Sequence, residues 1–461
     1  MSARTENSPT RSPVDSSDGR HAGIVITIAS LGFFLITLDI SIVNVALAQI
    51  RDELGGGTVG QQWIIDGYTL LFASLLLFAG NLSDRIGAKR SLALGITVFA
   101  VTSGVCAVAP SAGWLIAARC AQGAGAAIML PASMALVREA FPDPARRARA
   151  LGVWAVGGAV AGLVGQPLGG LLTTFDWRWV FTINLPVCVG MLCFLTVVTK
   201  SPTQPAPFDW AGQILAVISL STLVYGLIDG GRVGFGSPFV VVALLIAMSS
   251  LIGFVIVQAR VRHPMMPLDL FQARGFRLAL PVGFAFMVGN YGNVFVVSLY
   301  LQQQLDMSPL HAGLVFLPSA FFAIAANLAS GPVTNRFGAR VPVVGGLAVM
   351  ACGLIALLVC LPLGNPWLVA ASVVPIGAGG ALAMPSITSV VLDGVPGYRA
   401  GTASAVFNTF RQVGGAVAIA VFGALIANPD HVITGVRLST GIAAILLLLA
   451  ALSSLRIQPR N

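Results

Sequence analysis

The sequence predicts an all-α membrane protein that crosses the bilayer many times. Its 461 residues are 56% hydrophobic and only 9% charged, with a mean hydropathy of +0.88, whereas soluble domains carry about 25% charged residues. Apolar stretches recur from Ile24 to Leu455, each long enough for the ~20 helical residues that cross a bilayer. Such long stretches indicate helices and not barrel strands. A soluble enzyme, a secreted disulfide scaffold, a coiled coil and a disordered chain are therefore excluded.

Fourteen spans follow when glycine, proline and charged residues are taken as boundaries. They cover residues 24–48, 61–80, 91–110, 113–137, 150–173, 179–199, 211–229, 237–257, 278–303, 310–333, 341–363, 367–391, 401–427 and 434–455. Residues 1–23 are rich in serine, proline and arginine and lack the apolar core of a signal peptide. We expect them to form a disordered tail, with a second short tail at 456–461.

The basic residues predict the orientation of these spans. With the N-terminus inside, twenty of the 26 fall on the cytoplasmic side, four fall outside, and Arg119 and Arg411 lie within spans. Cytoplasmic loops carry an excess of Arg and Lys, so we expect a multi-pass protein of the cell membrane with both termini in the cytoplasm. The net charge of +9 is spread over short loops and forms no stripe, so no nucleic-acid partner is expected.

An internal repeat predicts two related bundles. Residues 80–90 resemble residues 331–340 at an offset of 251, and residues 123–131 resemble residues 377–385 at an offset of 254. Spans 2 and 4 thus correspond to spans 10 and 12, and spans 7 and 8 are an insertion. We expect a six-helix bundle at 24–200, two additional helices at 201–262 and a second six-helix bundle at 263–455. Two repeated bundles suit alternating access, in which one half rocks against the other.

The loop between spans 2 and 3 carries the first recognisable motif. In Gly80-Asn-Leu-Ser-Asp84-Arg85-Ile-Gly87-Ala-Lys89-Arg90, span 2 must turn directly into span 3. Asp84 could pair with a basic residue or a helix N-terminus of the opposite half in one state only, as a conformational latch; the alternative is a solvated turn that obeys the positive-inside rule. The pattern resembles the signature loop of the major facilitator superfamily. The candidate gating-loop residues are Gly80, Asp84, Arg85, Gly87, Lys89 and Arg90.

Span 4 carries a charged residue that needs compensation in the membrane. Arg119 has Gln122 and Gly123 on the same helix face, and an unpaired arginine in a span costs several kcal/mol unless it faces water. One interpretation is snorkelling to the outer surface. The run from Leu115 to Gly125 resembles the second motif of the superfamily, in which the resemblance implies that the arginine takes part in proton coupling.

Span 5 presents a face of small residues. Gly158, Gly162, Gly165 and Gly169 recur at spacings of four, three and four, which predicts close helix packing. Residues 165–170 resemble the antiporter motif Gly-Pro-x-x-Gly-Gly, but Gln166 stands where the motif has proline and Pro167 follows it. The candidate packing and hinge residues are Gly158, Gly162, Gly165, Pro167, Gly169 and Gly170.

Further segments resemble the fourteen-span drug:proton antiporter family of this superfamily. They are Leu38–Leu47 in span 1, Trp177–Pro186 before span 6, and Arg399–Gly415 in span 13. Ala48 replaces the proline that is usual after the first segment. The resemblance covers essentially the whole chain and implies a major facilitator fold of two six-helix bundles plus two inserted helices, fourteen transmembrane helices in all.

Two acidic residues within spans are candidates for carrying a proton. Burial disfavours a charged carboxylate, so a carboxyl can be protonated in one access state and ionised in the other. Asp39 in span 1 is the first candidate and Asp66 in span 2 the second, with Arg119 as their coupling partner. Asp39 could instead serve only as the ion-pair partner of Arg119.

Polar residues in the spans predict a substrate cavity. The candidates are Asn44, Gln122, Gln166, Asn290, Asn293, Asn408, Arg411 and Gln412. Ser404, Asn408, Arg411 and Gly415 form one stripe of span 13, and Arg411 lies roughly 15 Å from the cytoplasmic end at 1.5 Å per residue. For the amides, hydrogen bonding between helices is an equally good interpretation.

These features favour a proton-coupled exporter of a small amphipathic organic compound such as a drug, dye or antibiotic. The sequence has no Walker lysine, so we expect no ATP hydrolysis. It has no zinc-binding motif or cysteine pair, and its histidines lie in loops, so we expect neither a bound metal nor an enzyme activity. The expected partners are a small-molecule substrate, protons and the lipid bilayer, with no cofactor and a monomeric chain. An importer or facilitator of a metabolite, a membrane-embedded enzyme and a channel remain as alternatives.

Overall fold

The fold is helical throughout the part of the chain that can be described. The computed structural model describes residues 16–203, 208–393, 395, 399–427 and 431–457, and none of these residues forms a strand. The predicted tails therefore lie largely outside the described residues. The first helix begins at Ser16, eight residues before the predicted start of span 1.

The helices follow the predicted order of spans. The first half contains α1 (Ser16–Leu54), α2 (Gly57–Ile86), α3 (Ala88–Ala107), α4 (Ala112–Ala140), α5 (Pro144–Thr173), α6 (Trp179–Thr182) and α7 (Asn184–Thr196). The inserted pair is α8 (Trp210–Val233) and α9 (Pro238–Arg260). The second half contains η1 (Leu268–Gln272), α10 (Arg274–Met287), the π-helical η2 (Val288–Gly292), α11 (Asn293–Gln303), α12 (Pro309–Val315), α13 (Leu317–Phe337), α14 (Arg340–Cys360), η3 (Leu361–Leu363), α15 (Pro366–Asp393), α16 (Ala400–Leu425) and α17 (Val432–Ser454).

Thirteen segments of the described residues are long and apolar enough to cross a membrane. Helix α5 brings the number to fourteen when its two arms, Arg149–Gly162 and Val164–Thr173, are taken as one span bent by 41°. The predicted membrane class and its approximate span number are thus confirmed.

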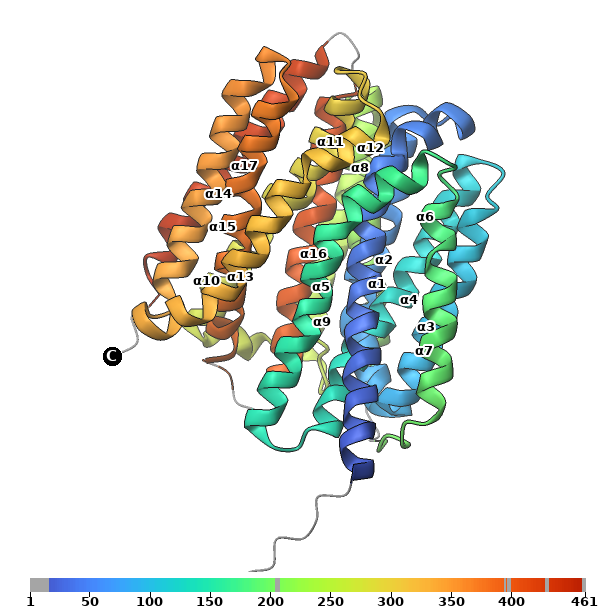
Figure 1. The fold of residues 1–461 in the computed structure, drawn as a ribbon, viewed down its shortest axis with the longest axis vertical. Coiled ribbons are helices and arrows are strands. Elements are labelled where there is room, and N and C mark those ends of the chain that lie inside the picture. The colour runs from blue at the N-terminus through green and yellow to red at the C-terminus, as the bar shows by residue number, and fades with distance from the viewer. Residues whose placement is uncertain (1–15, 204–207, 394, 396–398, 428–430, 458–461) are drawn as a thin grey trace, which may run out of the picture.

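Two six-helix bundles form the body of the molecule. In the first, α5 packs on α1, and α2 and α3 pack on α4; in the second, α16 packs on α10, and α13 and α14 pack on α15. Figure 1 shows the two bundles side by side, blue to green and yellow to red. The matching order of helix contacts agrees with the internal repeat in the sequence.

Glycines of the repeated motifs make matching close contacts in the two bundles. A Cβ at Gly125 would lie 3.2 Å from the carbonyl oxygen of Gly95, and one at Gly379 would lie 2.3 Å from that of Gly346. Each bundle thus brings two helix backbones into contact through a glycine pair. In the repeated loops, Gly87 and Gly338 both adopt positive φ, 86° and 77°, where a side chain would be strained.

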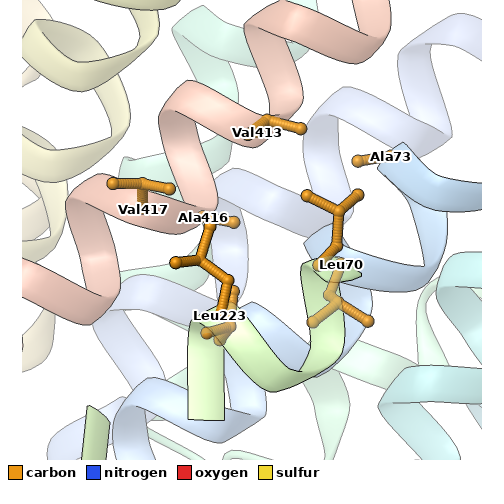
Figure 2. Close-up of a pocket in the computed structure, with 8 residues that line it drawn as sticks. Leu70, Ala73, Leu223, Val413, Ala416 and Val417 are labelled. Carbon is orange, nitrogen blue, oxygen red and sulfur yellow. The ribbon is translucent and has the colours of Figure 1, made fainter. Parts of the chain in front are cut away.

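Of the two inserted helices, α8 lies against both bundles, and α9 packs on α8. Helix α8 packs on α2 and α16, and Figure 2 shows apolar side chains of all three helices around a cavity of about 10 Å³. The cavity is small and its lining is apolar, so a water molecule there would find no hydrogen-bond partner.

Hydrogen bonds also hold the inserted helices. The side-chain amide of Gln213 donates to the carbonyl of Ser74 (2.9 Å). A buried carboxylate, Asp209, accepts from the backbone of Gly212 (2.8 Å) and from the side chain of Gln258 (2.5 Å).

The side-chain hydrogen bonds that join the two bundles among the described residues lie towards one end of the molecule. We call the end at which α1 begins and α17 ends the terminal face, and the other end the opposite face. Towards the opposite face, Gln62 donates to the carbonyls of Ile419 (3.2 Å) and Ala420 (2.9 Å), and Ser298 donates to the carbonyl of Asn44 (3.2 Å). Figure 1 shows the bundles diverging towards the terminal face. The structure is therefore closed at the opposite face.

Candidate functional site

An ion pair lies in the middle of the first bundle. Asp39 of α1 and Arg119 of α4 are both 0% exposed, and Nη1 of Arg119 donates to the carboxylate of Asp39. The same nitrogen donates to Gln122 Oε1 (2.7 Å), and Nε donates to the carbonyl of Ile64 (3.0 Å). Arg119 thus does not snorkel to the surface, because its charge is paired and two of its nitrogens donate hydrogen bonds inside the bundle.

Polar side chains from two further helices complete this network. Gln122 Nε2 donates to Asp39 Oδ1 (3.0 Å) and to Ser103 Oγ (2.8 Å). Asn184 Nδ2 donates to the same two oxygens, at 3.1 and 3.3 Å. Sequence reasoning assigned no role to Ser103 or Asn184. The available signal was weak: Ser103 lies in an apolar span, and Asn184 was one residue within a longer motif.

Aromatic rings enclose the guanidinium of Arg119. Its central carbon lies 4.4 Å from the ring centre of Tyr68 and 5.7 Å from that of Phe181, a cation–π arrangement that is strengthened by desolvation. Gly123 makes this approach possible, because a Cβ there would lie 2.2 Å from the Tyr68 carbonyl oxygen. The second motif therefore provides a charge, its amide partner and the space that both require.

Asp66 has a different environment from Asp39. It is 0% exposed, and neither carboxyl oxygen has a hydrogen-bond partner among the described residues. It lies one turn from Gln62, which bonds α16, and one turn from Leu70, which packs on α16. Asp66 therefore faces the interface between the two bundles, which we call the seam. An ionised carboxylate would have no compensating partner there.

The polar stripe of α16 holds the second arginine of the spans. Nη1 of Arg411 donates to Asn408 Oδ1 (3.0 Å), while Nε is buried without a partner. Its guanidinium lies 5.8 Å from the ring centres of both Phe286 and Phe407. Gln412 beside it is buried and its side-chain oxygen has no partner.

The other predicted cavity amides do not gather at one point. Asn44 donates to the Ile40 carbonyl of its own helix (2.8 Å). Gln166 and Asn293 are buried with an unpartnered side-chain oxygen each, and Asn290 lies in the π-helical segment η2. Such segments are frequent at functional sites. The structure thus joins Asp39, Arg119 and Gln122 in one network and Asn408 with Arg411 in another.

The predicted gating loop binds its own half of the molecule. Lys89 Nζ donates to the carbonyls of Thr196 (3.2 Å) and Val198 (2.5 Å), and Arg85 lies over the Phe208 ring at 4.9 Å. Asp84 is exposed and forms no ion pair with any described residue. A Cβ at Gly80 would meet nothing within 4 Å, and Arg90 is exposed. The predicted latch is not engaged when the opposite face is closed.

The glycines of α5 differ in what a side chain at each position would meet. Gly158, Gly165 and Gly169 contact α1: a Cβ at these positions would lie 2.2 Å from Phe33, 2.6 Å from Ser41 and 2.6 Å from Ile42, respectively. Gly162 contacts nothing within 4 Å and precedes the 41° bend, which lies N-terminal to Pro167. The continuous glycine face predicted from the sequence is thus interrupted at Gly162.

Gly170 serves the seam between bundles. A Cβ there would lie 2.6 Å from the carbonyl oxygen of Pro309, and one at Gly313 would lie 2.4 Å from that of Gln166. The segment that resembles the antiporter motif therefore forms part of the closure at the opposite face.

Comparison with known proteins identifies the family. The sequence profile of the Major Facilitator Superfamily matches residues 29–419. The chain belongs to the Major Facilitator Superfamily. Solved structures of a D-xylose-proton symporter and of a POT family transporter share this superfamily's fold, at 14% and 15% identity: their TM-scores are 0.69 and 0.73, and the matches cover 95% of this chain and 98% and 97% of theirs.

Several proteins that are similar to this chain in sequence have names that refer to drugs or antibiotics. The methylenomycin A resistance protein of Streptomyces coelicolor is 33% identical over 441 residues, 95% of this chain and 93% of its own. The drug efflux pump JefA of Mycobacterium tuberculosis is 35% identical over 410 residues, covering 88% and 80%. The cephamycin export protein CmcT of Amycolatopsis lactamdurans is 34% identical over 414 residues, covering 87% and 84%.

Proposed function

We propose that this transporter exports small amphipathic organic compounds by proton:substrate antiport. Relatives named as resistance, efflux and export proteins support export. The buried acidic residues support an ion gradient as the source of energy, since one charge that crosses 100 mV gains about 2.3 kcal/mol.

The observation that carries this proposal is the contrast between two buried carboxyls. Asp39 accepts from three side chains and neutralises Arg119, so it anchors the network as a carboxylate. Asp66 has no partner and faces the seam, so it carries its proton while the seam is dry. We therefore assign proton exchange to Asp66 and a positioning role to Asp39, which reverses the order suggested by the sequence.

Alternating access would connect this proton to transport. Opening of the opposite face would expose the seam and let Asp66 exchange its proton with water on that side. Closing would return the protonated acid to the apolar seam and open the terminal face. Substrate that enters from this face would admit water to the seam, and Asp66 would release its proton on that side, so that protons and substrate cross the membrane in opposite directions. We propose that the terminal face is cytoplasmic, as the distribution of basic residues predicts, and that the network and the α16 stripe line the substrate path.

Proteoliposomes with an imposed pH gradient test the proposal. The wild-type protein should accumulate at least one dye from a panel of anionic and cationic fluorescent compounds that includes fluorescein, and accumulation should stop when the gradient is collapsed. Asp66→Asn should lose gradient-driven transport by tenfold or more because the amide cannot release a proton. Asp52→Asn, an exposed acid at the end of α1, is the matched control. Full pH-driven transport by Asp66→Asn would refute the assignment.

A further inference from the structure

One arginine within the spans has no negative partner. Arg411 is held only by Asn408, its Nε is buried and unbonded, and it forms no ion pair with a described residue. Arg119, in contrast, is paired with Asp39. A guanidinium cannot shed its proton, and an uncompensated charge in the membrane interior is costly. The charge of Arg411 therefore calls for a partner that is not bound in this state.

The second bundle cannot supply that partner. From residue 263 onwards the sequence contains no glutamate and only four aspartates: Asp269, Asp306, Asp393 and Asp430. Arg399 donates to Asp269 and holds the pKa of that carboxyl below its usual value. Asp306 lies in the turn after α11 and Asp393 is the last residue of α15, while Asp430 is outside the described residues. No described aspartate of this bundle therefore lies in the interior of a helix.

The surroundings of Arg411 suit an organic anion. Phe286 and Phe407 place aromatic rings beside the guanidinium, and Asn408 and Gln412 add amides. A guanidinium binds carboxylate and phosphate groups through paired hydrogen bonds, while apolar walls with a few polar groups hold the body of a small ligand. Arg411 is partly exposed in this state.

We infer that Arg411 is the anion-binding group of the cargo site, and that the cargo is an amphipathic organic anion. This inference rests on the proposed export function, and it narrows the substrate class of the same site. Bound cargo would neutralise the charge of Arg411 within its span, with the aromatic or apolar part of the cargo against Phe286 and Phe407.

Two xanthene dyes of opposite charge test the inference. Equilibrium binding of fluorescein (anionic) and rhodamine 6G (cationic) is measured by fluorescence anisotropy on the purified full chain, and their pH-driven transport is measured in proteoliposomes. We expect fluorescein to bind more tightly. Arg411→Gln should weaken fluorescein binding about tenfold or more, as expected for a lost charge-assisted hydrogen bond, with no loss for rhodamine 6G. Arg411→Lys should retain part of the preference.

Arg277→Gln provides a control, because Arg277 is an exposed arginine in the first turn of α10. No detectable fluorescein binding, tighter binding of rhodamine 6G, or an equal loss of both dyes in Arg411→Gln would overturn the inference. The last result would indicate a structural role or a pairing with Asp66 in the other state. Fluorescein that binds Arg411 but is not moved by a pH gradient would instead contradict proton-coupled export and leave anion recognition standing.

Discussion

At the scale of single residues, hydrogen-bond partners distinguish chemically identical groups. Asp39 and Asp66 lie in adjacent helices and are equally buried, but Asp39 is surrounded by donors and Asp66 by none. The same contrast separates Arg119 from Arg411. Each half of the molecule thus contains one ionisable side chain within a span, Asp66 or Arg411, that has no ionic partner among the described residues.

We expect Asp39→Asn to destabilise the protein as well as abolish gradient-driven efflux. Removing the carboxylate leaves the Arg119 charge buried and unpaired, a change that typically costs about 3–5 kcal/mol. The double variant Asp39→Asn/Arg119→Gln should recover much of this loss, since it buries no charge. Thermal unfolding of the purified protein in detergent measures both effects.

The exposed pair Arg51–Asp52 is the control for this comparison. Asp52→Asn should change stability by less than about 1 kcal/mol, because surface ion pairs contribute little. If the double variant melted no higher than Asp39→Asn, the ion pair would not be the source of the loss.

At the scale of helices, small residues decide which backbones approach one another. Glycines bring α5 onto α1, α4 onto α3 and α15 onto α14, because in lipid the attraction between helices comes from close packing and not from the hydrophobic effect. The bend of α5 begins after Gly162, which contacts no other helix. Helix α5 therefore combines close contacts with α1 and a bend of 41°.

Two alanine variants of α5 should behave in opposite ways. Gly169→Ala should destabilise by about 1–3 kcal/mol, the usual cost of overpacking, because its Cβ would lie 2.6 Å from the Ile42 carbonyl oxygen. Gly162→Ala meets open space and should be neutral or stabilising by up to about 1 kcal/mol, because alanine favours the helix. Melting temperatures that fall equally in both variants would show that space beside the glycine is not what matters.

At the scale of the whole molecule, the two bundles contact each other closely at the opposite face. The closure consists of backbone contacts, such as Gly313 against Gln166, and of hydrogen bonds from Gln62 to α16. The gating loop lies at the other end of α2 and is bonded to the first half, where Lys89 Nζ donates to the carbonyl of Thr196. The inserted helix α8 contacts both bundles, so it must follow or resist their movement.

Gly313→Val should shift the population towards the state that is closed at the terminal face. A Cβ at Gly313 would lie 2.4 Å from the Gln166 carbonyl oxygen, so the side chain blocks closure at the opposite face. Spin labels at Arg90 and Arg336, exposed positions near the terminal face of the two halves, report the change by double electron–electron resonance in a cysteine-free background. We expect a shorter distance in this variant.

Gly345→Val is the control for this shift, because nothing lies within 4 Å of a Cβ at that glycine. Its distance distribution should match that of the parent protein. An unchanged distribution in Gly313→Val would mean that the contact with Gln166 does not hold the opposite face closed.

The sequence by itself determined the membrane class, the order of the spans, the repeat and the motifs, because span length, apolar character and local turns depend on neighbouring residues alone. It also identified Asp39, Arg119 and Gln122, since polar residues within apolar spans are conspicuous. Only the tertiary structure decided that Ser103 and Asn184 join them, that Asn44 bonds its own helix, and that Asp66 and not Asp39 lacks a partner. Those outcomes depend on which helix faces meet across the bundles, and in lipid the cost of a buried charge is set by the partners found there.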